Sequence, residues 1–396
     1  MAEKRLLGNW LQGFLDWTMP RSETPESMLK WVGLFTLASV KKRKVYWPQE
    51  LMGGYTIFPN LYVVLVGEPA VVRKSTTIGF AEKIISQYNE LTDGFVLNPV
   101  NFSGDVTSHS KLLDGLANSG DSSLSVVSGE FSSLIQTTPE QMYELLTDIF
   151  DNKQKFEWST WAHGDKSIKE PVVNLLAATT PAWISKQPPE YFVGGGFASR
   201  ILFLYEEGPR ELEIFYDHVD QAKIKSLQVQ LSNDLGIIAG FEGAFTFDTK
   251  GTKEFIRSWY KSQDASTADT RLKGYYGRKH VHALKIAGLL SMCERSDLKV
   301  TQAHWEEAIK LLDYIERRMG NAFSTLGQNT FAVMMDGILD YIEAFETRTM
   351  TEIAGRFYRE GITLDQLKSS LAFLCTGGKI VATGKLENPT YRFKER

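Results

Sequence analysis

A lysine–serine pair follows an apolar run and a glycine in the stretch LYVVLVGEPAVVRKSTT. Gly67 ends the apolar run, and Lys74 and Ser75 open a segment whose apolar residues recur at helical spacing. A strand, a tight turn and a helix in this order present backbone N–H groups, an ammonium and a hydroxyl to phosphate groups and Mg²⁺. An ordinary strand-to-helix turn is the alternative, although the helix dipole disfavours a lysine at that end.

This loop differs from the usual G-x-x-x-x-G-K-[ST] pattern in its length and in one residue. Lys74 lies seven residues after Gly67 rather than the usual six, and Arg73 stands where a second glycine is expected. We expect the extra residue to let the loop bulge, so that Arg73 avoids a positive φ. Its guanidinium then either adds positive charge near the phosphates or points outward.

Polar residues follow two later apolar runs. Glu130 comes directly after the run in SLSVVSGEF, where a carboxylate can polarise an attacking water. Ser128 and Gly129 precede it where an aspartate that orders Mg²⁺ is usual, and a solvated surface acid is the alternative. The run in VVNLLAATTP ends in Thr179 and Thr180, and either hydroxyl could orient the water.

Two arginines complete the set of candidate chemical groups. Arg200 stands between three glycines and an apolar strand in GGGFASRILFLY, where it could stabilise transition-state charge in a neighbouring subunit. A surface arginine at a strand start is the alternative. Arg278 opens an apolar helix and could reach a γ-phosphate when that helix closes over a nucleotide. His280 and His282 are two residues apart on the same helix, do not share a face, and are interpreted as structural.

These residues need a scaffold of alternating strands and helices. Apolar runs at 61–66, 95–100, 123–127, 172–178 and 200–205 alternate with helical patterns, which predicts a parallel sheet with helices on both faces.

The segments on either side of this scaffold are mainly helical. Residues before 52 and after 206 have helical periodicity, and the last segment has three helices and two strands, the winged-helix order. Thr351 and Thr363 are expected to cap its second and third helices. The basic run Lys41 to Lys44 is interpreted as a solvated helix end, with a nucleic-acid contact as the alternative.

Composition sets limits on the class of protein. The 396 residues suffice for two or three domains, and the net charge of −4 makes any nucleic-acid site a local basic patch. Cys293 and Cys375 are far apart in apolar helical runs, which excludes a disulfide framework. No apolar stretch is long enough to span a membrane, and no signal peptide is recognised. A cytoplasmic protein is therefore expected, in a bacterial host if a phage or mobile element encodes it.

Four stretches, in this order, resemble the AAA+ ATPase domains of phage, prophage and plasmid replication proteins. They are IFPNLYVVLVGEPAVVRKSTT, VVSGEFSSLI, NLLAATTP and GGGFASRILFLYEE. These domains are related to the superfamily III helicases of viruses and mobile elements. The loop of that family, G-x-[PS]-x-x-x-R-K-[SGT]-T, contains the extra residue and the arginine, so that Arg73 follows the family pattern. The resemblance covers residues 30–290.

The resemblance implies an α/β fold: a P-loop AAA+ parallel sheet of the additional-strand, catalytic-glutamate (ASCE) class with helices on both faces. A helical subdomain and a C-terminal winged helix are expected to follow. The expected divisions are 1–52 for an N-terminal helical collar or docking segment, 53–210 for the ATPase core, 211–328 for a lid-like helical subdomain, and 329–396 for the winged helix.

The resemblance also implies roles for single residues, with ATP and Mg²⁺ as cofactors. Lys74 and Ser75 would hold the triphosphate and the metal, and Glu130 would be the catalytic acid beside that metal. Thr179 or Thr180 would be the first sensor, Arg200 the finger that acts on a neighbouring subunit, and Arg278 the second sensor. The expected nucleotide-binding residues are Gly67, Pro69, Arg73, Lys74, Ser75, Thr76 and Arg278.

A hairpin is expected in DNKQKFEWSTWAHGDKSIKEP, with its turn at HGD. Similar helicases insert a β-hairpin here whose basic tip grips a nucleic-acid strand in the central channel of a ring. Cations beside Trp158 and Trp161 suit single-stranded DNA, because phosphates are neutralised and bases stack. A solvated hairpin that packs its tryptophans on the core is the alternative. The candidate DNA-binding residues are His163, Lys166 and Lys169.

The function implied is that of a ring-forming replicative DNA helicase of a phage or other mobile element. Its expected partners are single-stranded or forked DNA, further copies of itself in a hexamer, and a separate primase or other replication protein. One alternative is an ATP-dependent loader that remodels protein–DNA complexes without unwinding. The other is a winged-helix DNA-binding regulator whose phosphate loop is vestigial.

Overall fold

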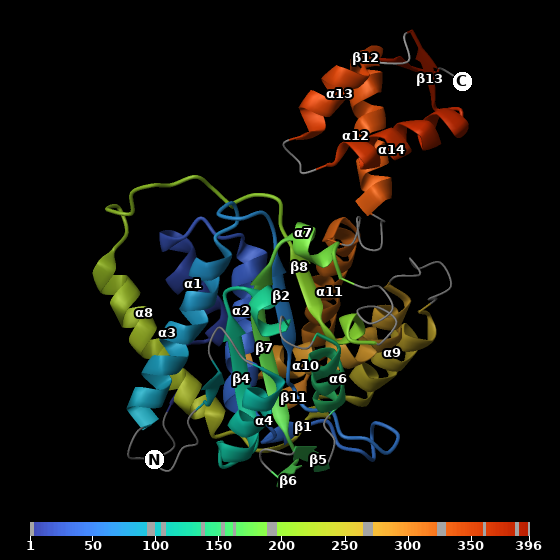
Figure 1. Cartoon of the computed structure of the whole chain (residues 1–396). Coiled ribbons are helices and arrows are strands. Elements are labelled where there is room, and N and C mark those ends of the chain that lie inside the picture. Colours follow the sequence, from blue (N-terminus) through green and yellow to red (C-terminus); the bar gives the residue numbers. More distant parts are fainter. Residues whose placement is uncertain are drawn as a thin grey trace. The chain divides into compact units, whose positions relative to one another are not determined.

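The computed structural model divides into two compact units, residues 1–324 and 325–396 (Figure 1). Each unit is described separately. The structure describes residues 4–92, 100–103, 108–135, 139–151, 155–160, 164–187, 196–263, 272–322, 330–358, 362–384 and 388–394.

A parallel sheet forms the centre of the larger unit. Its four main strands are β2 (Tyr62–Val66), β4 (Ser123–Ser128), β7 (Val172–Thr179) and β8 (Leu202–Tyr205), and the two-residue β3 (Phe102–Ser103) lies at one edge. The strand order is β3-β4-β7-β2-β8. The prediction of a parallel sheet is therefore confirmed, although most of the strand expected at 95–100 lies outside the described residues.

Helices cover this sheet because its central strands are apolar on both faces. α2 (Glu26–Lys41) and α3 (Lys74–Thr92) pack against β7, and α5 (Phe131–Ile135) and α6 (Pro139–Phe150) also contact β7. In Figure 1 α2 and α3 lie on one side of the sheet and α6 on the other. Further helices of this unit are α1 (Trp10–Thr18), α4 (His109–Asn118), α7 (Pro181–Ile184), α8 (Gln221–Ala239), α9 (Lys250–Lys261), α10 (Lys273–Glu294) and α11 (Gln302–Ala322).

The N-terminal helices belong to the core of the larger unit. α1 packs against α2, α8 and α10, and nearly every residue of α2 is buried. Trp10 in α1 donates its indole N–H to the carbonyl of Leu231 in α8 at 3.0 Å. A short parallel pair joins the segment after α2 to a later part of the chain, β1 (Val45–Tyr46) with β9 (Gly243–Ala244). A second pair, β10 (Thr246–Phe247) with β11 (Lys299–Val300), joins two later segments.

The basic run Lys41 to Lys44 is not a solvated helix end, so that prediction was wrong. Lys41 is fully buried, and its Nζ donates to the carbonyls of Ile238 at 2.8 Å, Ala239 at 3.3 Å and Phe241, where α8 ends. Lys42 is buried as well and pairs with Asp121 at 2.6 Å. The run therefore caps one helix and ties α2 to the sheet, because helix ends leave carbonyls without partners.

The smaller unit combines helices with an antiparallel sheet. Its helices are α12 (Thr330–Ala344), α13 (Met350–Phe357) and α14 (Leu364–Thr376), and its strands are β12 (Thr347–Thr349), β13 (Ile380–Thr383) and β14 (Thr390–Phe393), ordered β12-β14-β13. Thr363 caps α14 as predicted, in a capping box with Gln366. The cap of α13 is Thr349 with Glu352, so the prediction of Thr351 was wrong; Thr351 instead bonds Asn388.

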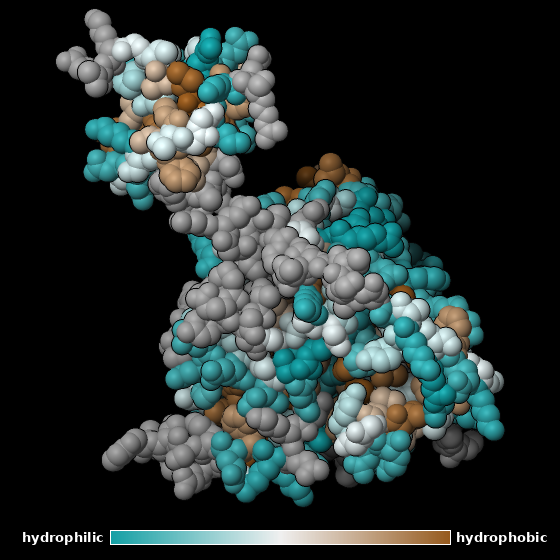
Figure 2. Space-filling model, turned by 90° about the vertical axis from the view of Figure 1, so that its right-hand side faces the viewer, coloured by the Kyte–Doolittle hydropathy of each residue, from teal (hydrophilic) through white to brown (hydrophobic). Residues whose placement is uncertain are grey.

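The surface of the molecule is mixed in polarity. On the face in Figure 2, hydrophilic residues surround a few groups of hydrophobic ones. Among the described helices, none is both long and apolar enough to cross a membrane. Cys293 and Cys375 are both free thiols, as expected.

The buried cap by Lys41 predicts a large loss of stability for Lys41→Met. Methionine has a similar length but leaves the carbonyls at the end of α8 without a donor. We expect the free energy of unfolding to fall by about 2–4 kcal/mol at pH 7 in urea denaturation. Lys44→Met is the matched control: it removes the ion pair with the exposed Glu242, at 3.3 Å, and is expected to cost less than about 1 kcal/mol.

Lys41→Met is also expected to change how the free energy of unfolding depends on pH. Burial lowers the pKa of Lys41 to about 7. Above that pH the unfolded chain binds more protons than the folded chain, so the free energy of unfolding rises with pH up to the ordinary lysine pKa. Lys41→Met should flatten this rise between pH 7 and pH 9, whereas an unchanged slope would contradict the assignment.

Candidate functional site

A pocket of about 280 Å³ lies where three parallel strands end. In the register of the sheet, Val66 of β2 pairs with Thr179 of β7, and Ser128 of β4 pairs with Ala177. The segments that follow these strands therefore meet at one edge. The pocket is lined by Pro69, Ala70, Arg73, Lys74, Ser75, Thr76, Gly129, Glu130, Ala178, Thr179 and Thr180. This set includes most of the residues that were predicted to bind nucleotide or act in catalysis.

The loop before α3 has a strained backbone. Arg73 has a φ of 53° and Ala70 a φ of 62°, both in the left-handed region that favours glycine. The expectation that the extra residue frees Arg73 from a positive φ was therefore wrong. Such conformations persist only where surrounding contacts hold them, and they cluster at binding sites.

Arg73 is held by an ion pair outside the pocket. Its Nε lies 2.5 Å from Oε2 of Glu23, a residue of the N-terminal segment that is only 7% exposed. The other carboxylate oxygen of Glu23 accepts the backbone N–H of Glu213 at 2.8 Å. This N–H and the Arg73 guanidinium hold the pKa of Glu23 below its ordinary value. The guanidinium therefore fixes the loop, although its side chain also forms part of the pocket wall.

Gly67 is the residue at which a side chain does not fit. A Cβ there would lie 2.6 Å from Cγ2 of Val72 and 2.8 Å from the carbonyl oxygen of Glu206. The glycine therefore allows the loop to return closely over the end of β2. Sequence analysis identified Gly67 from its place after the strand, and the structure supplies this second reason for it.

Lys74 opens α3 and folds back over the loop. Its Nζ donates to the carbonyl of Gly67 at 2.5 Å and to that of Glu68 at 3.0 Å. Burial lowers the pKa of this ammonium, while the charges of Glu130 and Glu68 oppose the shift. The ammonium thus has only backbone carbonyls as direct acceptors within the described residues, and a phosphate group would be a stronger acceptor at the same position.

Glu130 is exposed at the opposite wall of the pocket, and its backbone is anchored by Ser128. The Ser128 hydroxyl donates to the carbonyl of Glu130 at 2.8 Å and accepts the N–H of Glu130 at 3.3 Å. Ser132 donates to the Glu130 carboxylate at 3.2 Å. Ser128 therefore orders the acid instead of supplying a second carboxylate.

The two threonines at the end of β7 have different surroundings. Thr179 is buried, and its carbonyl accepts the N–H of Gly67 at 3.4 Å, which ties the strand to the loop. Thr180 caps α7, and its hydroxyl accepts the N–H of Trp183 at 3.3 Å. Because the cap occupies the Thr180 hydroxyl, Thr179 is the better candidate to orient a water.

Arg200 and Arg278 lie away from this pocket. Arg200 lies two residues before β8, at the amino end of the sheet, and both arginines pair with Asp151 at the end of α6. The Arg278 pair measures 2.9 Å, and Arg200 also donates to the carbonyl of Gly196 at 2.8 Å. Arg200 is only 7% exposed. Sequence analysis missed Asp151, because nothing in its local pattern marks it as the shared partner.

The predicted hairpin is present, but its turn is not at HGD, because Gly164 and Asp165 belong to β6. β5 (Lys155–Thr160) pairs antiparallel with β6 (Gly164–Lys169), and Lys169 is exposed at the end of β6. His163 and Trp161 lie outside the described residues, and the side chains of Trp158 and Lys166 are not described either. His282 is structural, as predicted: it bonds the carbonyl of Ser199 at 3.0 Å, and burial lowers its pKa to about 3.

Comparison with models of known protein families and with curated protein sequences gave no match. The site is therefore interpreted from its own geometry and chemistry.

The strain at Arg73 predicts that glycine is tolerated there better than alanine. Both Arg73→Ala and Arg73→Gly remove the ion pair with Glu23, but only alanine keeps the strain of a positive φ. The glycine variant should be more stable than the alanine variant by about 1 kcal/mol in chemical denaturation. Ala222, on the exposed face of α8, is the control residue with a helical backbone. There Ala222→Gly should lower the free energy of unfolding by about 1 kcal/mol. Equal stability of the two Arg73 variants would mean that the loop is not strained at this residue.

Proposed function

We propose that this chain binds ATP with Mg²⁺ at the pocket before α3 and hydrolyses it, as a P-loop AAA+ ATPase of the ASCE class. The observation that carries the proposal is the meeting of Lys74, Ser75 and Glu130 in one pocket at the carboxyl edge of a parallel sheet. A helix N-terminus, an ammonium and a hydroxyl suit phosphate groups and Mg²⁺, and the carboxylate suits a water.

The order of the strands supports the same class. β7 lies between the loop-bearing strand β2 and the acid-bearing strand β4, as an additional strand between loop and acid. Thr179 at the end of β7 therefore lies between the phosphate loop and Glu130. The three helices and three-stranded sheet of the smaller unit support a winged helix.

The side chains fit the proposed ligand. Lys74 would exchange its bonds to the carbonyls of Gly67 and Glu68 for phosphate oxygens. Among the described residues no three carboxylate, histidine or cysteine groups are gathered to hold a metal alone. This agrees with Mg²⁺, which enters such sites with few protein ligands and with the phosphates of the nucleotide. Bound Mg²⁺ would neutralise charge on those phosphates.

The protein groups would divide the reaction among themselves. Glu130 would accept a hydrogen bond from the attacking water and orient it toward the terminal phosphate, with Thr179 as a second contact. Arg73 would keep the loop in its strained form through Glu23, and Arg200 would act on the nucleotide of a neighbouring copy after it leaves Asp151. Hydrolysis is expected to be slow, because neither Ser128 nor Gly129, which precede Glu130, supplies the usual aspartate that orders Mg²⁺.

We further propose that hydrolysis drives translocation on single-stranded DNA, in a hexameric replicative helicase of a phage or other mobile element. The β5–β6 hairpin, with the exposed Lys169 at its base, is the support for a DNA contact. A separate primase would be its partner in the cytoplasm of a bacterial host. Ser128 favours the second candidate, a slowly hydrolysing loader or remodeller of protein–DNA complexes.

Substitutions in the pocket should separate binding from hydrolysis. Lys74→Ala is expected to weaken ATP binding at least tenfold, because the loop loses its ammonium. Glu130→Gln should keep ATP binding and lower kcat by about 10²–10³-fold, because only the water contact is weakened. Lys83→Ala, on the exposed face of the same helix, is the matched control and should leave both unchanged. The measurements are nucleotide titration and steady-state phosphate release.

Two results would contradict the ATPase proposal. One is the absence of Mg²⁺-dependent ATP hydrolysis by the wild type at any DNA concentration. The other is ATP binding that is equally tight in wild type and Lys74→Ala.

The hairpin predicts a selective effect on DNA. The double variant His163→Ala with Lys166→Ala should retain basal hydrolysis but lose stimulation by single-stranded DNA, since the pocket is untouched and cations are lost. The measurement is the ratio of ATPase rates with and without an oligonucleotide, at two salt concentrations. Lys186→Ala, outside the hairpin, serves as the control. Undiminished stimulation in the double variant would show that the hairpin does not contact DNA. ATP hydrolysis without strand displacement would favour the loader or remodeller over the helicase.

A further inference from the structure

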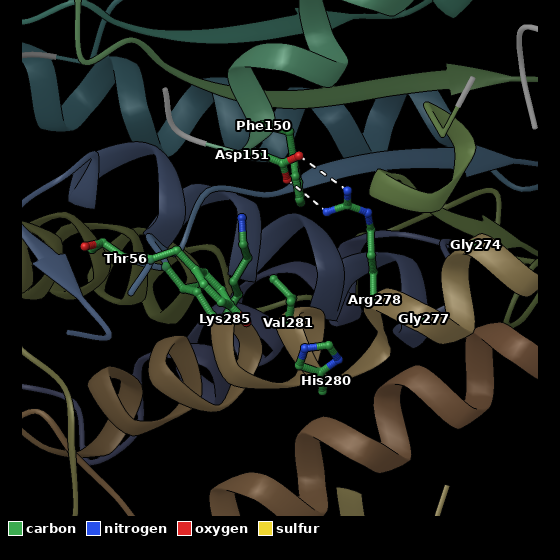
Figure 3. Close-up of a pocket in the computed structure, with 11 residues that line it drawn as sticks. Thr56, Phe150, Asp151, Gly274, Gly277, Arg278, His280, Val281 and Lys285 are labelled. Carbon is green, nitrogen blue, oxygen red and sulfur yellow. Dashed lines mark hydrogen bonds and ion pairs between the residues drawn. The ribbon is translucent and has the colours of Figure 1, made fainter. Parts of the chain in front are cut away.

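A second and larger pocket, of about 580 Å³, lies beside the amino end of the sheet (Figure 3). Its walls come from α10, from the end of α6 and from residues 55–57. Arg278 and Lys285 contribute cationic side chains, Phe150 an aromatic ring, and Asp151 a carboxylate. None of these residues lines the pocket before α3, so the two sites are distinct.

Lys285 is the unusual group in this pocket. It is only 1% exposed, and its Nζ donates to the backbone carbonyl of Asn60 at 3.0 Å and to the Asn60 side chain at 2.7 Å. The ring centroid of Phe150 lies 3.8 Å from the same nitrogen. These partners are all neutral, and the described residues provide no carboxylate within 4 Å. Buried charges are normally paired, because desolvation of an isolated ion is costly.

The charges around the pocket do not balance. Arg200 and Arg278 share the single carboxylate of Asp151, and Lys285 adds a third cation. Within the described part of the chain the two guanidinium groups alone leave one positive charge in excess, and protonated Lys285 adds a second. Burial lowers the pKa of Lys285 well below its ordinary value, because the charge of Asp151 only partly offsets the cost of desolvating the ammonium. A bound anion would remove this cost.

The backbone adds to the positive potential. Gly274 and Gly277 lie in the first two turns of α10 and line the pocket, so the positive end of this helix is close to it. The residue before the helix, Leu272, offers no side-chain cap. A Cβ at Gly277 would meet no atom within 4 Å, so the missing side chain leaves open space.

We propose that this pocket binds the phosphate group of a nucleotide, with Arg278 and Lys285 as its cationic ligands and the exposed Tyr55 as a contact for the base. The carboxylate of the half-exposed Asp151 pairs with the guanidinium of Arg278 and would compete with a phosphate group for it. Phosphate and an aromatic ring together are the features of a nucleotide, either free or within a single strand. The β5–β6 hairpin begins four residues after Asp151, so a strand bound at the hairpin would pass near this pocket.

The test uses the full-length chain with Lys74→Ala as background, so that binding of the probes at the pocket before α3 is weakened. The probes are inorganic phosphate, thymidine monophosphate and a fluorescent oligothymidylate, and binding is measured by calorimetry and anisotropy. We expect Lys285→Met to weaken binding of the nucleotide probe at least tenfold. The same variant is expected to melt at a lower temperature, because two buried oxygens of Asn60 lose their donor, so binding is measured where the variant is folded.

Two further variants make the test specific. Gly277→Leu fills the open space and should abolish binding, whereas Gly236→Leu on α8 is the matched control, since a Cβ there also meets no atom within 4 Å. Asp151→Asn removes the competing charge and should strengthen binding several-fold. A purely structural role for Asp151 would instead give a lower melting temperature with no gain in affinity.

The outcomes distinguish a free nucleotide from a nucleic-acid strand as the source of the phosphate. They also distinguish failure of this proposal from failure of the proposed ATPase function. Loss of oligothymidylate binding together with loss of monophosphate binding identifies a strand as the ligand, and loss of monophosphate binding alone identifies a free nucleotide. The proposal is overturned if no probe binds, or if all probes bind Lys285→Met and Gly277→Leu as tightly as the background protein. Because the background lacks Lys74, either result is independent of whether the pocket before α3 hydrolyses ATP.

Discussion

The parallel register of β4, β7 and β2 is the constraint on which the candidate site depends. Parallel strands end at the same edge of a sheet, so residues far apart in sequence meet wherever their strands end together. Val66 pairs with Thr179, and Ser128 lies level with Ala177. A shift of one residue in β7 would turn Thr179 to the opposite face and break the contact with Gly67. The buried Val and Leu residues of these strands, which face helices on both sides, hold that register.

The loop at this edge combines strain with an external clamp. Two non-glycine residues have a positive φ, and Arg73 is fixed through Glu23 to the N-terminal segment and to Glu213. A loop with glycine at 73 would not need this clamp. The arginine instead couples the shape of the loop before α3 to the N-terminal segment and to the segment around Glu213. Changes in those segments can therefore reach the pocket through one ion pair, which a glycine loop does not allow.

Periodicity and local motifs predicted much of this structure, and contacts between distant residues account for the rest. The strands, the long helices, the hairpin and the residues of the first pocket follow patterns within ten or twenty residues of sequence. Lys41 was misjudged because its acceptors lie almost 200 residues later, at the end of α8. Asp151 and Lys285 were missed for the same reason, since their surroundings exist only after α6 and α10 pack together. Thr349 rather than Thr351 caps α13, because Thr349 forms a capping box with Glu352. The helix therefore begins two residues earlier than a cap at Thr351 would place it.

The two pockets lie at opposite ends of the sheet and differ in their balance of positive and negative charge. At the carboxyl end, Lys74 is near the carboxylate of Glu130, and the charges are close to balanced before any ligand arrives. At the amino end, Arg200 and Arg278 share one carboxylate, and the ammonium of Lys285 is buried among neutral groups. If the proposed function holds, Arg200 would link the two pockets, because an arginine that left Asp151 for the nucleotide of a neighbouring copy would free that carboxylate. Asp151 would then pair with Arg278 alone, which would lower the positive charge of the second pocket. Binding at one edge and binding at the other would therefore oppose each other through a single carboxylate.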